Sequence, residues 1–100
     1  MRTIRLYREL PVAEEARVVG RQLLRSATST AANHRAVCRA RSDAEHFAKL
    51  GITIEEDDES ALWLEIIVES DLLPAVRVLP LHADFVEITA ILAKARKSAS

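Results

Sequence analysis

The sequence predicts an all-α protein, folded as an antiparallel up-and-down four-helix bundle with a short first helix. Only 2 Gly and 3 Pro occur among the 100 residues, and the abundance of Ala, Leu, Arg and Glu favours helix throughout. Hydrophobic residues make up 49% and charged residues 29% of the chain, which is typical of a globular domain. A chain of this length supports one modest core, so we expect a single domain over residues 1–100.

Two helices are expected in the basic half of the chain. Residues 1–10 form a short amphipathic segment that ends at Pro11, and a helix this short depends on packing for its stability. The second helix is expected from about residue 13 to residue 40. Glu14 and Glu15 lie at its start, where the helix dipole favours acids.

The stretch from Ser42 to Ser70 predicts one long central helix. Ser42 and Glu45 have the spacing of a capping box, which satisfies backbone N–H groups at a helix start. One face is apolar at 100° per residue, and the residues on it are Phe47, Leu50, Ile54, Ala61, Leu64 and Val68. The two-residue link at 40–41 predicts that this helix runs antiparallel to the one before it.

The last helix is expected to follow a turn over residues 73–80. Pro80 suits the first turn of a helix because its missing N–H has no intrahelical partner there. The apolar face of this helix is expected to contain Leu81, Phe85, Ile88, Leu92 and Ala95.

The net charge of −1 conceals a strong asymmetry between the two halves of the chain. Residues 1–41 hold nine arginines and three acids, whereas residues 42–100 hold five Lys or Arg and twelve acids. The two halves should therefore attract each other, or attract the opposite halves of another copy.

A row of arginines occupies one side of the second helix, within an arc of roughly 80° at helical spacing. This arginine row consists of Arg17, Arg21, Arg25, Arg35 and Arg39. It can be a solvated face, a charged contact with the acids at residues 55–59 of a neighbouring subunit, or a surface for nucleic-acid phosphates. Aromatic residues to stack bases are almost absent, which argues against sequence-specific reading of single strands.

Four positions are predicted to be buried and polar: Asn33, His34, Asp58 and Glu65. Asp58 and Glu65 fall within the apolar arc of the central helix, and a carboxylate there is costly unless it is paired. They are expected to meet groups of the second helix or to lie between subunits. The alternative is a metal or proton site that includes His34.

The central helix is also apolar on its opposite side, at Trp63, Ile66 and Ile67. These residues can belong to the core, but we expect four helices with short links to be too few to cover both sides. We therefore expect them to form a subunit interface, where aromatic and aliphatic anchors gather.

No pattern in the sequence predicts catalysis or a cofactor. Carboxylate-bridged metals in bundles use Glu-x-x-His pairs, and none of the three histidines has a Glu three residues before it. Cys38 has no second cysteine for a zinc site. We expect no catalytic residue, no metal, no cofactor, no small-molecule substrate and no membrane span. The single cysteine fits a reducing cytoplasm.

Several motifs resemble those of a bacterial family of "four helix bundle proteins", whose first members were found encoded in intervening sequences of large-subunit ribosomal RNA genes. The motifs are RQLLRSATS from Arg21, Ala32-Asn33, CRARS from Cys38 and DESALWLE from Asp58. The resemblance implies an antiparallel four-helix bundle, often a ring of five subunits, without established enzymatic activity. The chain is also similar to the accessory variability determinant of diversity-generating retroelements, which binds nucleic acid and partners a reverse transcriptase.

Together, the residues and the resemblance predict a non-enzymatic bundle that forms a ring-like homo-oligomer, with an assembly or adaptor role. The alternative is an accessory factor that binds RNA or DNA backbones through the arginine row.

Overall fold

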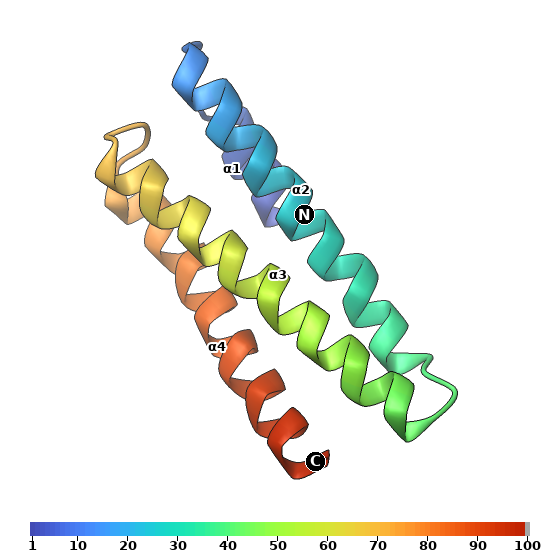
Figure 1. Cartoon of the computed structure of the whole chain (residues 1–100). Coiled ribbons are helices and arrows are strands. Elements are labelled where there is room, and N and C mark those ends of the chain that lie inside the picture. The colour runs from blue at the N-terminus through green and yellow to red at the C-terminus, as the bar shows by residue number, and fades with distance from the viewer. Residues whose placement is uncertain (100) are drawn as a thin grey trace.

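The computed structural model describes residues 1–99, which fold into four helices. They are α1 (Arg2–Arg8), α2 (Glu14–Cys38), α3 (Asp43–Glu69) and α4 (Ala75–Ala99). The three long helices alternate in direction along a rod of 45 × 18 × 18 Å, and the short α1 lies against the N-terminal half of α2 (Figure 1). The all-α, up-and-down bundle with a short first helix is thus confirmed.

The third helix is the centre of the arrangement. α2 and α4 each pack along α3, whereas α2 and α4 do not pack against each other anywhere in the described chain. The short α1 lies across α2 and α4 at one end only. This leaves the far half of the bundle as essentially three helices, with α3 between the other two (Figure 1).

The residues that α3 buries are Leu50, Thr53, Asp57, Ser60, Ala61, Leu64 and Ile67, and all but Ala61 follow a heptad-like spacing. Leu50, Ala61 and Leu64 of the predicted face are confirmed as buried. The other three predicted residues, Phe47, Ile54 and Val68, are only partly buried. The middle of the buried face is polar, at Thr53, Asp57 and Ser60. The spacing of apolar residues therefore does not predict that these positions are buried.

Both ends of α3 have specific caps. The Glu45 backbone N–H donates to Ser42 Oγ at 3.1 Å, as predicted, but the Glu45 carboxylate accepts from the Arg41 N–H and not from Ser42. At the other end Asp71 has a φ of 55°, and Leu72 N donates to Ile67 O at 3.0 Å. This is a Schellman motif with an aspartate in the left-handed position.

The prediction for the start of the last helix is wrong. α4 begins at Ala75, and Pro80 lies inside it. The Arg77 N–H donates to Pro74 O at 3.0 Å, so the helix opens five residues earlier than Pro80. A proline this close to the start loses one backbone hydrogen bond, which the burial of Val78 and Leu81 on either side of it offsets.

The contact between α1 and α2 requires a glycine. A Cβ on Gly20 would lie 2.8 Å from Leu10 Cδ1 and 2.9 Å from Tyr7 Cε1. The absence of a side chain at this position therefore lets α1 approach α2 closely, and Leu6 of α1 reaches the main core.

We expect the Gly20→Leu variant to lose about 1–3 kcal/mol of unfolding free energy, the usual cost of overpacking, because the added side chain would displace α1. Urea denaturation followed by circular dichroism measures this loss. Ala31→Leu, at an exposed position of the same helix, is the matched control and should change stability by less than about 0.5 kcal/mol. Equal effects of the two substitutions would contradict the close packing of α1.

Candidate functional site

The arginine row is mostly open to solvent. All five of its arginines are exposed, and within residues 1–99 Arg17, Arg21, Arg35 and Arg39 have no acidic partner. Arg25 differs, because its guanidinium pairs with Glu59 and lies 3.7 Å from Glu56 Oε2, both on α3 of the same chain. The predicted charged contact is therefore made within one subunit at Arg25, and four cations stay available to a partner.

The structure does not support the whole of the subunit interface that was predicted at Trp63, Ile66 and Ile67 of α3. The prediction that Ile67 lies in a subunit interface is wrong, since this side chain is fully buried among Leu23, Leu64 and other core residues of its own chain. Trp63 is half-buried against the same core, and its Nε1 donates to Glu59 Oε2 at 3.3 Å. Ile66 is half-buried. The chain covers this side of α3 because α2 packs along it.

An exposed apolar surface lies instead on α4. Six exposed apolar residues of α4 follow one another at spacings of three and four residues, which place side chains on one helix face. They are Val76, Leu79, Ala83, Val86, Ala90 and Ala93. We call this surface the α4 stripe. Its three largest members, Val76, Leu79 and Val86, are 77%, 53% and 50% exposed. The sequence does not predict the α4 stripe, because the turn expected over residues 73–80 removes Val76 and Leu79 from the helix.

Acidic side chains border the α4 stripe. Leu79 shares a shallow pocket of about 180 Å³ with Glu65, Glu69 and His82, between α3 and α4. His82 Nε2 lies 3.0 Å from Glu65 Oε2. Glu55 and Asp58 are also exposed on α3. Exposed apolar groups of α4 and the carboxylates of Glu65 and Glu69 therefore lie next to each other, whereas the arginine row on α2 carries the opposite charge.

The buried carboxylate is Asp57, not Asp58. Asp58 is exposed, whereas Asp57 is 0% exposed and neither of its carboxylate oxygens has a hydrogen-bond partner among residues 1–99. Around it the core is polar. Ser60 Oγ donates to Ser26 Oγ at 2.8 Å, and the buried Thr53 hydroxyl donates to Lys49 O at 2.7 Å. We call Ser26, Thr30, Thr53, Asp57 and Ser60 the polar layer.

Burial raises the pKa of Asp57 to about 6, because an ionised carboxylate loses its hydration inside the core. The nearby His34 imidazole and Thr30 hydroxyl lower this pKa by less than burial raises it. The Thr30 hydroxyl is engaged elsewhere, since it donates to Ser26 O at 2.9 Å. The carboxyl therefore carries a proton more readily than a solvated aspartate.

The remaining predictions of buried polar residues are also corrected. His34 and Glu65 are exposed, and Glu65 contacts His82 of α4 in place of a group on α2. Asn33 is half-buried and donates to Ser29 Oγ at 3.3 Å. His34 follows Thr30 by one helical turn on α2, and its imidazole is exposed although it is near enough to Asp57 to lower the pKa of that carboxyl.

Metal ligands are not assembled in the described chain. Within residues 1–99, no three His, Cys, Asp or Glu side chains are grouped so that they could hold an ion. Cys38 is exposed and has a free thiol. No helix among these residues is both long and apolar enough to cross a bilayer. The features that distinguish the surface are therefore the arginine row and the α4 stripe with its acids.

Comparison with known families agrees with this arrangement of four helices. The model of the 23S rRNA-intervening sequence protein family matches residues 1–94, which is nearly the whole chain. The chain belongs to this family. A crystal structure of a protein of unknown function from the S23 ribosomal protein family of Bacteroides thetaiotaomicron VPI-5482 is similar to this family member, with a TM-score of 0.87 and 31% identity. The match covers 96% of this chain and 89% of the other. None of the curated proteins compared with the chain is significantly similar to it.

The buried carboxyl of Asp57 predicts that the unfolding free energy of the protein increases as the pH falls from neutral. Because its folded-state pKa of about 6 exceeds the ordinary value of 3.8, the folded state binds the proton more tightly and is stabilised as the pH falls through 6. Between pH 7 and pH 4.5 this adds about 2 kcal/mol to the unfolding free energy of the wild type.

The Asp57→Asn variant lacks this titration, so its stability relative to the wild type should be highest at neutral pH and shrink by about 2 kcal/mol towards pH 4.5. Urea denaturation at a series of pH values measures the difference. Asp58→Asn is the matched control, because it removes the neighbouring exposed carboxylate. A wild-type minus Asp57→Asn difference that is constant with pH would contradict the assignment.

Proposed function

We propose that this protein is a non-enzymatic, self-assembling bundle whose subunits bind one another to form a ring, and that the ring serves as an adaptor in the cytoplasm. The α4 stripe is the main support. Val76, Leu79 and Val86 are each at least half exposed along one face of a helix, and apolar surfaces of this kind mark protein–protein contacts more often than they stay in water. The small side chains of Ala83 and Ala90 between them allow a second helix to approach closely.

The charges favour a head-to-tail contact between subunits. The arginine row lies on α2, whereas Glu65 and Glu69 of α3 share a pocket with Leu79 of the α4 stripe. Glu55 and Asp58 are exposed at helical spacing before Glu65, on the same side of α3. The two surfaces are complementary in charge and belong to different parts of one subunit. A contact between unlike surfaces repeats from copy to copy and closes into a ring when the rotation permits. The family resemblance implies five subunits.

The buried apolar area would supply most of the affinity of this contact, and the charges would set its orientation and partner choice. In the proposed contact the four unpaired arginines would face carboxylates, whereas the reversed orientation would bring like charges together and is disfavoured. The proposed assembly role requires no catalytic group. The exposed free thiol of Cys38 suits the reducing conditions of the cytoplasm.

A second candidate function is binding to the phosphate backbone of RNA or DNA. Arg17, Arg21, Arg35 and Arg39 are exposed and unpaired in the described chain, and cations along one helix can follow a polyanion. Arg25 is less available for this role because Glu59 and Glu56 already engage it. The net charge of −1 restricts such binding to this one surface of the subunit.

The Val86→Glu substitution should shift the protein towards monomers, because it places a charge in the middle of the α4 stripe. Sedimentation equilibrium at micromolar concentration measures the mass, and circular dichroism checks that the helices persist. Val12→Glu is the matched control, since Val12 is 96% exposed in the link before α2. A wild-type protein that is monomeric at these concentrations would refute the proposal, and so would a Val86→Glu variant that assembles normally.

Replacing the four unpaired arginines, Arg17, Arg21, Arg35 and Arg39, with Gln distinguishes the two candidate functions. For the proposed ring, the variant should assemble at least about tenfold more weakly, and wild-type assembly should weaken with salt. For backbone binding, the variant should lose the retardation of a structured RNA in native gels while keeping its oligomeric mass. If neither property changes, the arginine row is a solvated surface and both uses of it are excluded.

A further inference from the structure

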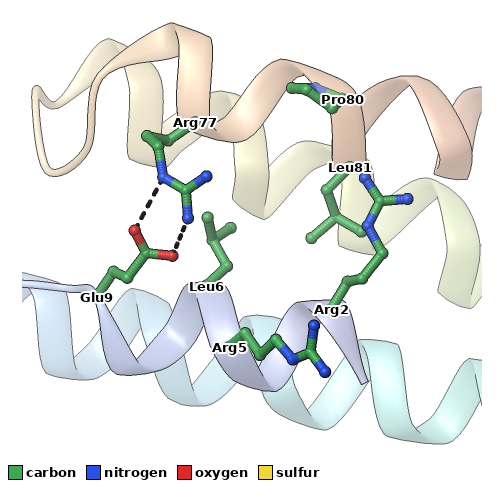
Figure 2. Close-up of a pocket in the computed structure, with 7 residues that line it drawn as sticks. All are labelled: Arg2, Arg5, Leu6, Glu9, Arg77, Pro80 and Leu81. Atoms are coloured by element: carbon green, nitrogen blue, oxygen red, sulfur yellow. Dashed lines mark hydrogen bonds and ion pairs between the residues drawn. The ribbon is translucent and has the colours of Figure 1, made fainter.

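A pocket of about 260 Å³ lies between α1 and the first half of α4. Figure 2 shows its two opposite walls, with Leu6 of α1 and Glu9 just after α1 on one side and with Arg77, Pro80 and Leu81 of α4 on the other. The pocket is formed only because the short α1 packs onto α4 at this end of the bundle. It is separate from the arginine row on α2, and neither candidate function uses it.

Ion pairs close both ends of this pocket. At one end Arg77 of α4 holds the Glu9 carboxylate in a two-pronged contact, with Nε 2.9 Å from Oε1 (Figure 2). This contact lowers the pKa of Glu9. At the other end Arg2 pairs with Asp84 of α4. One pair links α1 to α4 and the other links the residue after α1 to α4, so the Arg2 and Arg77 guanidinium groups each have an acidic partner.

The third arginine of the pocket is unpaired. Arg5 lines it from α1 (Figure 2), is exposed, and has no acidic partner within residues 1–99. Counting Arg2, Arg5 and Arg77 against Glu9 and Asp84 leaves one positive charge at this site. A single guanidinium with free N–H donors recognises the planar oxygens of a carboxylate well.

The floor of the pocket is apolar. Leu6 and Leu81, which are 4% and 8% exposed, lie together with Pro80 between the Glu9–Arg77 pair and the Arg2 side chain (Figure 2). A fully hydrated inorganic anion gains nothing from such a floor, whereas a short hydrocarbon group is removed from water there. The volume is near the lower end of ligand pockets, which suits a small molecule.

We propose that this pocket binds a small apolar monocarboxylate, whose hydrocarbon part rests on Leu6, Leu81 and Pro80 and whose carboxylate accepts hydrogen bonds from Arg5. The single excess charge matches a monoanion, and the apolar floor favours an organic acid over phosphate. The ligand would bridge α1 and α4, and would therefore hold the short first helix in place. Its binding does not depend on assembly or on nucleic acid.

Hexanoate is a suitable probe for this proposal, and NMR titration of the ¹⁵N-labelled full chain measures its binding. Hexanoate should shift amide signals of α1 and of residues 77–81 in a saturable manner. The Arg5→Gln variant should bind it about tenfold more weakly, because one charge-assisted hydrogen bond is lost. Arg8→Gln is the matched control, since Arg8 is exposed on the same helix and does not line this pocket. It should bind hexanoate like the wild type.

Two further probes test the chemical class of the ligand. Hexylamine carries the opposite charge on the same hydrocarbon, and inorganic phosphate carries negative charge without one, so both should bind at least about tenfold more weakly than hexanoate. The proposal is overturned if Arg5→Gln and Arg8→Gln bind hexanoate equally, if phosphate binds as tightly as hexanoate, or if no probe produces saturable shifts at residues 2–9 and 77–81.

Discussion

The arrangement of this bundle depends on a constraint at the middle of α3. This helix is the one that packs against both other long helices, so its buried face must serve two neighbours at once. The centre of that face is polar: Thr53, Asp57 and Ser60 stand between Leu50 and Leu64. The hydroxyls satisfy each other or backbone carbonyls, but Asp57 has no partner in the described chain. A carboxyl that is buried here without a partner lowers the stability of the bundle, because it loses its hydration and gains no hydrogen bond in exchange.

The same constraint explains why apolar surface remains outside. With a polar layer in the core and a first helix that covers one end only, the chain places fewer apolar side chains inside than its 49% hydrophobic content would allow. Much of the remainder lies on α4, where Val76, Leu79 and Val86 are exposed. Association that buries the α4 stripe would stabilise the fold by mass action, and the separation of arginines on α2 from acids on α3 would orient it.

The four helices could be predicted from the sequence, but the residues that each helix buries or exposes could be predicted only in part. Helix starts at Glu14 and Ser42 could be predicted because their caps and charges are local. The identity of the buried acid could not be predicted. Asp57 and Asp58 are adjacent, and the spacing of the hydrophobic residues favours Asp58 because the buried face of α3 is itself polar at its centre. Ile67 was assigned to an interface because the covering of α3 by α2 is a tertiary property. The α4 stripe was missed because Pro80 was assumed to start its helix. The pocket around Arg5 could not be predicted from the sequence, since its lining residues come from two segments that are far apart in the chain, residues 2–9 and residues 77–81.

A carboxyl group without a partner inside the core is the feature on which this account of the bundle rests. The most direct measurement is the pKa of the Asp57 side-chain carboxyl, from the pH dependence of its ¹³Cγ chemical shift in the folded protein. The structure predicts a pKa of about 6. A value at or below the 3.8 of a solvated aspartate would show that this carboxylate is ionised and well partnered, and would contradict the polar layer described above.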